Sequence, residues 1–156
     1  MLALLSQAPP AILDPKLVRV YVFTEAGVDA VETAALRESV KDVSAGLKGK
    51  KKTVAIVDDE DRADVVIEVI ERTRTIPKVV IGLAARPGQP SSGIPPPARV
   101  VHLRVTLTHR DESIELTNKN APLESAGGWK SAADDIVKQC DRWITENHAR
   151  LLASRR

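Results

Sequence analysis

The carboxylates that follow residue 57 have the spacing in this chain that most invites a chemical interpretation. Asp58 to Asp61 come directly after the apolar run Val54–Val57, and Asp64 comes soon after them. A calcium-binding loop of the EF-hand type needs oxygen ligands at its first, third and fifth positions and glycine at its sixth. Counted from Asp59, the fifth position is Ala63 and the sixth is Asp64, so the pattern fails. We therefore predict no metal site and interpret the four consecutive carboxylates as a solvated turn.

Asp64 and Glu68 also have the spacing of the acidic pair in restriction-type nucleases. That chemistry requires a lysine two positions after the glutamate, and this chain has Ile70 there. We predict no catalytic residue from this pair. A small enzyme is kept as an alternative hypothesis, in which scattered polar groups meet on an open face of a sheet: Asp64, Glu68, His102 and Arg104.

The other reactive side chains form no recognisable site. Cys140 is the only cysteine, which excludes an internal disulfide and a cysteine-built metal site. His102 and His109 are an odd number of residues apart on one expected strand, so they face opposite sides, and His148 belongs to a helix. In Gly127–Ser131 a tryptophan separates the glycine from the lysine of a phosphate-binding loop, so we expect only a turn into a helix. No cofactor is predicted.

A cluster of lysines at residues 48–52 could bind phosphates or an acidic surface. It contains Lys48, Lys50, Lys51 and Lys52. However, it follows an expected helix C-terminus, where the helix dipole favours cations, and it has no interleaved aromatic or arginine. The net charge of +2 also gives little support for a polyanion partner. Weak polyanion binding is therefore a second alternative, and we do not expect a nucleic-acid partner.

The bulk composition is that of one globular domain. The chain has 156 residues, of which 43% are hydrophobic and 28% charged, and only 3% are aromatic, so the core must be aliphatic. No stretch approaches the roughly 20 apolar residues that span a bilayer. Residues 15–156 are predicted to form the domain. Residues 1–14 are either a disordered start or the remnant of a signal peptide, since Leu2–Leu5 precede the small residues around Ala8. The first alternative leaves the protein cytoplasmic, and the second makes it exported or periplasmic.

The first half of the domain reads as strand, helix, strand. Residues 17–23 alternate around β-branched side chains, which is typical of a strand. Asp29 and Glu32 form an acidic variant of the capping box, so a helix should begin there. Apolar residues at steps of four and three then mark its buried face: Leu36, Val40, Val43 and Leu47. A right-handed crossover places residues 17–23 and 53–57 parallel, as neighbours in a sheet.

The long strand that begins near residue 63 should lie in the middle of this sheet. Val65, Ile67 and Val69 point to the core, whereas Glu68 and Arg72 are expected on a half-polar face that is open to solvent. Residues 78–83 could add a short strand. Residues 84–98 contain five prolines and are predicted to be a mobile loop.

The second half should be a hairpin and a closing helix. Residues 99–108 and 113–118 alternate in polarity around a turn at 109–112. The final helix carries both tryptophans, Trp129 and Trp143, on the face expected to be buried. The predicted fold class is α+β: a two-layer sandwich with both helices on one face of a four- to five-stranded mixed sheet, in the order β-α-β-β-β-β-α.

This pattern resembles small bacterial cell-envelope domains. The residues that carry the likeness are the helix VETAALRESVKDV, the strand ADVVIEVIER and the terminal helix WKSAADDIVKQCDRWITEN. Over about residues 17–150 their order is similar to the amino-terminal domain of the Tol-Pal translocation protein and to the curli secretion-channel family. The resemblance implies an envelope binding or assembly module, and it transfers no functional residue.

The function hypothesis is therefore a non-enzymatic binding module. We expect it to contact a protein partner, or a second copy of itself, through the open sheet face or through the sheet edge near the proline-rich loop. The candidate binding residues on the face are Glu68, Arg72, His102 and Arg104. The candidates for polyanion binding are Lys50, Lys51 and Lys52.

Overall fold

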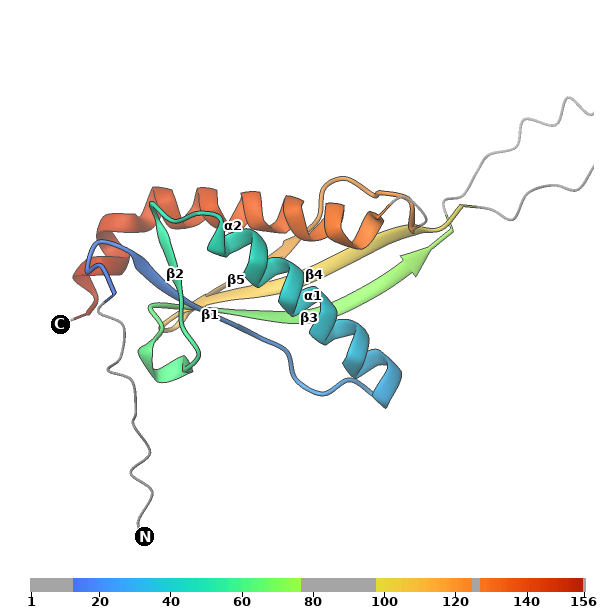
Figure 1. Cartoon of the computed structure of the whole chain (residues 1–156), viewed down its shortest axis with the longest axis horizontal. Coiled ribbons are helices and arrows are strands. Elements are labelled where there is room, and N and C mark those ends of the chain that lie inside the picture. Colours follow the sequence, from blue (N-terminus) through green and yellow to red (C-terminus); the bar gives the residue numbers. More distant parts are fainter. Residues whose placement is uncertain (1–12, 77–97, 125–126, 156) are drawn as a thin grey trace, which may run out of the picture.

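The computed structural model describes residues 13–76, 98–124 and 127–155. They form five strands, two long helices and a short 3₁₀ turn between the second and third strands. The elements follow one another as β1 (Val18–Phe23), α1 (Ala30–Lys48), β2 (Val54–Ile56), η1 (Glu60–Arg62), β3 (Val65–Thr75), β4 (Val100–His109), β5 (Glu112–Thr117) and α2 (Gly128–Ala153). Both helices pack against the sheet and against each other (Figure 1). The predicted strand at 78–83, most of the predicted loop at 84–98 and residues 1–12 lie outside the described residues.

The sheet is mixed and has the order β2-β1-β3-β4-β5. β1 is parallel to β2 and to β3, whereas β3–β4 and β4–β5 are antiparallel. The two-layer α+β sandwich is confirmed, with β3 as its central strand and with β1 and β2 as parallel neighbours. In this order the β1-α1-β2 unit lies on one side of β3 and the hairpin β4–β5 on the other, and β2 and β5 are the edges of the sheet.

The helix α1 begins where the sequence predicts. Asp29 Oδ1 accepts a hydrogen bond from the backbone N–H of Glu32 at 2.8 Å, and Glu32 Oε2 accepts one from the N–H of Val28 at 2.6 Å. The carboxylates of Asp29 and Glu32 therefore satisfy two N–H groups at this end of the helix. The buried face of α1 contains Leu36, Val43 and Leu47, with Val40 packed beside them.

The core between helices and sheet is aliphatic. Alternate residues of every long strand point into it, and the burial pattern of β4 alternates without a break from Val100 to His109. On the helix side the buried residues of α2 include Ile136, Cys140 and Ile144. Trp129 and Trp143 are only partly buried at the margin of this core, so the prediction that both belong to its buried face holds only in part.

A bulge in β3 reverses the predicted facing of its second half. Val69 pairs with Val105 but Glu71 pairs with Arg104, so Ile70 is an extra residue in the ladder. After this point the residues on the helix side are even-numbered. Arg72 therefore pairs with the buried Leu103 and points toward the helices, and its predicted place on the open face is wrong. A one-residue shift moves every following side chain to the other face of a strand.

Candidate functional site

The sheet face opposite the helices has an apolar half and a polar half. Its apolar half lies on β1 and β3, where Tyr21 is in register with Val66 and Phe23 with Glu68. The Tyr21 and Phe23 rings stack with centroids 5.6 Å apart and an interplanar angle of 12°. They are the only tyrosine and phenylalanine of the chain, and both are half-buried. Within the described residues, no helix covers them.

Sequence reasoning missed this aromatic pair. The signal that could have found it is the spacing of two within the strand, because residues i and i+2 share one face. With Val20 and Val22 buried in the core, Tyr21 and Phe23 must face away from the helices. The predicted strand thus contained the information, but the binding candidates were sought only among charged side chains.

The polar half of the face lies on β4 and β5, and its groups are paired with one another. Arg104 forms ion pairs with Glu71 and with Glu115, the latter at 3.3 Å. His102 Nε2 lies 2.9 Å from Thr75 Oγ1. Each predicted candidate on this face, apart from Glu68, is therefore engaged by a cross-strand neighbour, as is common in antiparallel sheets.

Glu68 lies at the border between the two halves. It is opposite Thr106 on β4 and beside Phe23 on β1. Burial raises the pKa of its carboxyl, and the nearby charge of Glu25 raises it further. The four residues proposed for a small enzyme do not converge, because Asp64 is held by two arginines, while His102 and Arg104 bond to other partners.

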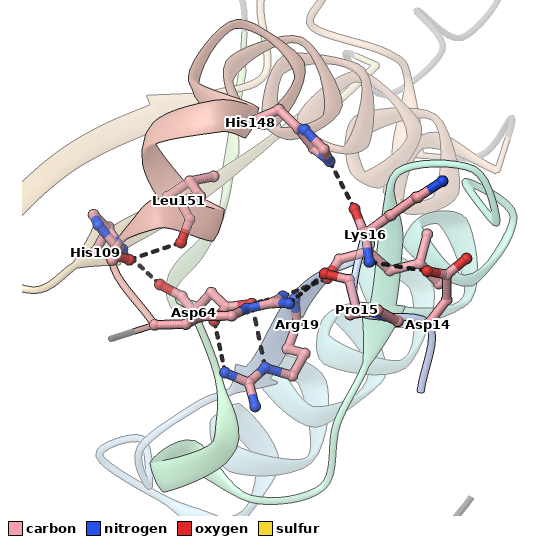
Figure 2. A network of polar contacts seen from close by, with 11 residues as sticks. Asp14, Pro15, Lys16, Arg19, Asp64, His109, His148 and Leu151 are labelled. Carbon is pink, nitrogen blue, oxygen red and sulfur yellow. Dashed lines mark hydrogen bonds and ion pairs between the residues drawn. The ribbon is translucent and has the colours of Figure 1, made fainter. Parts of the chain in front are cut away.

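Asp64 joins both ends of the described chain to the middle of the sheet (Figure 2). Its carboxylate accepts hydrogen bonds from the backbone N–H of Arg19 at 2.7 Å and from the Arg19 guanidinium at 2.8 Å. Arg155, just beyond α2, donates Nε to the same carboxylate at 2.9 Å and also binds the carbonyl oxygens of Pro15 and Leu17.

The network around Asp64 extends through two histidines. His109 Nδ1 donates to the carbonyl oxygen of Asp64 at 2.7 Å, and His148 Nε2 donates to that of Lys16 at 2.8 Å. Burial alone would raise the pKa of Asp64, but the hydrogen bonds from Arg155 and Arg19 outweigh it and lower the pKa to about 2. The side chain of Asp64 is only 3% exposed, so we assign it a structural role.

The lysine turn after α1 is partly occupied by a structural contact. Lys50 Nζ lies 3.3 Å from a carboxylate oxygen of Asp141 on α2, while Lys51 and Lys52 are exposed. One of the three predicted polyanion-binding lysines is therefore tied to the helix layer. Binding of polyanions through this turn stays a prediction.

Arg72 is a contact between the sheet and both helices. Its guanidinium lies 4.1 Å from the ring centre of Trp129 on α2, and Nη1 binds the carbonyl oxygen of Ala35 and the carboxylate of Glu38 on α1, the latter at 3.2 Å. Its side chain is 9% exposed. The bulge at Ile70 is what brings this arginine to the helix side.

We expect Arg72→Ala to lower the free energy of unfolding by about 2 kcal/mol, because a largely desolvated cation–π contact and a charged hydrogen bond are lost together. Arg72→Lys should recover less than half of the loss, since an ammonium cannot both stack on Trp129 and bond to two acceptors. Urea denaturation monitored by circular dichroism measures both. The exposed Arg62→Ala is the control, and a loss for Arg72→Ala no larger than the control's would contradict the assigned contact.

The remaining reactive groups offer no further site in the part of the chain that the structure describes. Burial raises the pKa of the Cys140 thiol to about 12, so it is protonated and unreactive at neutral pH. Asp59 caps the turn η1 by accepting from the N–H of Asp61 at 3.0 Å. Among the described residues no group of three or more histidine, cysteine, aspartate or glutamate side chains could hold a metal ion. None of the described helices is both long and apolar enough to cross a bilayer.

These features define a small α+β domain with one open sheet face. No family model and no curated protein matches the sequence. Among solved structures, the chain is similar to an uncharacterized lipoprotein B from Nitrosomonas europaea, with 14% identity over 87% of this chain and 80% of that chain, and a TM-score of 0.37. A likeness at this level does not bear on the site.

Proposed function

We propose that this chain is a non-enzymatic binding or assembly module whose contact surface is the apolar half of the open sheet face. The observation that carries the proposal is the stacked pair Tyr21 and Phe23, half-buried on a face that neither helix covers. Large, rigid aromatic side chains are enriched at the centres of protein interfaces, because they bury much area at little cost in side-chain entropy. The two rings are not part of the buried core, which is aliphatic.

The surroundings of the pair support binding over catalysis. The neighbouring polar half consists of threonines, serine and mutually paired charges, of which Arg104 with Glu115 is an example. Such a surface is suited to the polar rim of an interface. A general acid or base needs a side chain free to reach a substrate, and within the described residues His102 and Asp64 are both engaged.

The partner we propose is a protein, either a second copy of this chain or another component of the cell envelope. The envelope setting is supported by the resemblance of residues 17–150 to envelope domains. Determining the mature N-terminus of the protein from its native cell tests that setting. Cleavage after Ala8 would support it, and a start at Met1 would contradict it.

Sedimentation and pull-down experiments with wild type and two variants test the contact surface. We expect the wild-type chain to sediment as a dimer at high concentration, or to retain a partner from its own lysate, and Tyr21→Ser/Phe23→Ser to weaken that association by about tenfold or more. The matched control is Thr108→Ala/Ser113→Ala, on the polar half of the same face, which should associate like wild type. A strict monomer that retains no partner, or equal association by the aromatic variant, would overturn the proposal.

A further inference from the structure

The inner strand β3 has a second edge, part of which no strand of the described residues pairs with. β1 pairs with β3 only from Val65 to Glu68, and Thr24 Oγ1 then donates to the carbonyl oxygen of Val69 at 2.7 Å. Beyond this point β3 continues to Thr75, paired with β4 alone among the described residues. Figure 1 shows β3 and β4 continuing together past the end of β1. Within the described residues, the edge from residue 70 to residue 75 therefore leaves backbone N–H and C=O groups for another strand.

Two hollows follow this edge from one end to the other. The first, of about 290 Å³, is lined by residues that include Thr24, Glu25, Glu32, Glu68 and Ile70. The second, of about 320 Å³, is lined by Asp29, Val31, Glu32, Ala35, Arg72, Arg74 and Trp129. Glu32 belongs to both, so the hollows are adjacent. Together they border β3 from Glu68 to Arg74, a length of roughly 20 Å at about 3.3 Å per residue.

Exposed apolar side chains border the two adjacent hollows, which we call the channel. Val28, just before the N-cap of α1, is 97% exposed, and Val31, in the first turn of α1, is 79% exposed. An isolated exposed valine needs no explanation, but two of them beside an unpaired strand edge can cover the alternate side chains of an added strand. An added strand would take up, next to β3, the position that β1 leaves after Phe23.

The negative charge at the first hollow favours a cationic partner. Glu25 and Glu68 make no ion pair within the described residues, and burial together with the Glu25 charge raises the pKa of Glu68. The two arginines on the strand are already neutralised, Arg72 by Glu38 and Arg74 by Glu124 at 2.8 Å. A cationic side chain at the first hollow would therefore find an uncompensated negative potential.

The two outer edges of the sheet are less suited to this task. β2 is only three residues long. β5 carries Glu112 and Glu115, and the carbonyl oxygen of its last residue, Thr117, already accepts a hydrogen bond from Gln139 at 2.9 Å. Charged side chains and covered ends are the usual protections of an edge strand.

We propose that the free edge of β3 captures an extended, lysine- or arginine-rich peptide segment of a partner protein, which joins the sheet as an added strand beside residues 70–75. The backbone supplies the hydrogen bonds, Val28 and Val31 cover apolar side chains, and Glu25 and Glu68 pair with the cations. This site adjoins the aromatic pair at Glu68, which is in register with Phe23, but it uses the edge of β3 and not the open face of the sheet.

A labelled peptide of about six residues in which valine and lysine alternate is the probe, since this length matches the edge from residue 70 to residue 75. Fluorescence anisotropy should show it binding at least about tenfold more tightly than the same peptide with glutamate in place of lysine. A version with a central proline, which cannot donate to the ladder, should also bind about tenfold more weakly. Amide hydrogen exchange should slow at residues 70–75 when the lysine peptide is bound.

Charge reversal in the channel is the matched mutational test. Glu25 is exposed, and Glu25→Lys should weaken binding of the lysine peptide by about tenfold. Glu60→Lys makes an equal charge change on η1 and should leave the affinity for the peptide unchanged. Tyr21→Ser, at the end of the aromatic pair that is in register with Val66 and not with Glu68, should also bind the peptide like wild type, which separates this site from the proposed contact surface. Equal affinity for the lysine and glutamate peptides, or protection at 112–117 in place of 70–75, would overturn the proposal.

Discussion

Replacing Asp64 by alanine is expected to lower the free energy of unfolding by about 3 kcal/mol, since it leaves two arginines without their shared carboxylate. Arg19 and Arg155 are 32% and 20% exposed, so solvent reduces the cost below that of a fully buried pair. The loss also releases the contacts that Arg155 makes with Pro15 and Leu17. Urea denaturation monitored by circular dichroism measures the change.

The control for this variant is Asp58→Ala. Asp58 is exposed in the same acidic stretch, and its replacement should change the free energy of unfolding by less than about 0.5 kcal/mol. If Asp64→Ala proved no more destabilising than Asp58→Ala, the network in Figure 2 would not contribute to stability.

The same network predicts a particular dependence on pH. The pKa of Asp64 is lowered from 3.8 to about 2 on folding, so the unfolded chain takes up the proton first as the pH falls. The stabilisation, about 2 kcal/mol, is therefore complete above about pH 4 and is lost as the pH falls through about 2. Asp64→Asn cannot titrate here, and wild type should lose about 2 kcal/mol more than this variant between those limits. Parallel profiles would contradict the assigned pKa.

The second large effect is expected from Gly128→Ala. The first residue of α2 is buried, and a Cβ placed there would lie 2.9 Å from the carbonyl carbon of Leu123 and 3.1 Å from a methyl group of Val101. Leu123 cannot move away freely, because it bridges Val100 beside the start of β4. Overpacking against backbone should cost about 3 kcal/mol, measured by thermal and urea unfolding.

Gly127→Ala is the matched comparison, one residue earlier. A Cβ at this position meets open space, but the backbone has φ 67°, in the left-handed region, which costs roughly 1 kcal/mol for a residue with a side chain. Gly128→Ala should therefore be the more destabilising of the two. The reverse order would mean that the segment before α2 yields more easily than its hydrogen bonds suggest.

Local rules were sufficient for most of the fold. The alternation of β4, the helical spacing of Leu36 to Leu47 and the cap at Asp29 depend on neighbours within a few residues, and the structure confirms the elements that they predict. The order β-α-β likewise required a parallel crossover, because a right-handed connection is the one that packs a helix back onto the sheet. These elements predicted β1 and β2 as parallel neighbours and β3 in the middle of the sheet, whereas the full strand order came from the structure.

The candidate surfaces were less accessible, since they depend on contacts between distant residues. The extra residue at Ile70 turned Arg72 from the open face to Trp129, and no local pattern distinguishes a bulge from regular alternation. Asp64 was one of the polar groups of the alternative enzyme hypothesis, and its structural role depends on Arg155, 91 positions later. In the part of the chain that the structure describes, the second edge of β3 has no partner strand after Glu68 because β1 ends at Phe23 while β3 continues, and only the register of the two strands reveals this.

By itself, then, the sequence determined which segments become helices and strands, and that the core is aliphatic, because backbone propensity and side-chain periodicity are local properties. The tertiary structure alone decided which carboxylates are neutralised by arginines and which keep their charge. Glu68 and Asp64 are four residues apart on one segment, yet one is a half-buried group without an ion pair among the described residues and the other the centre of a closed network. Their difference arises from what folding places beside them.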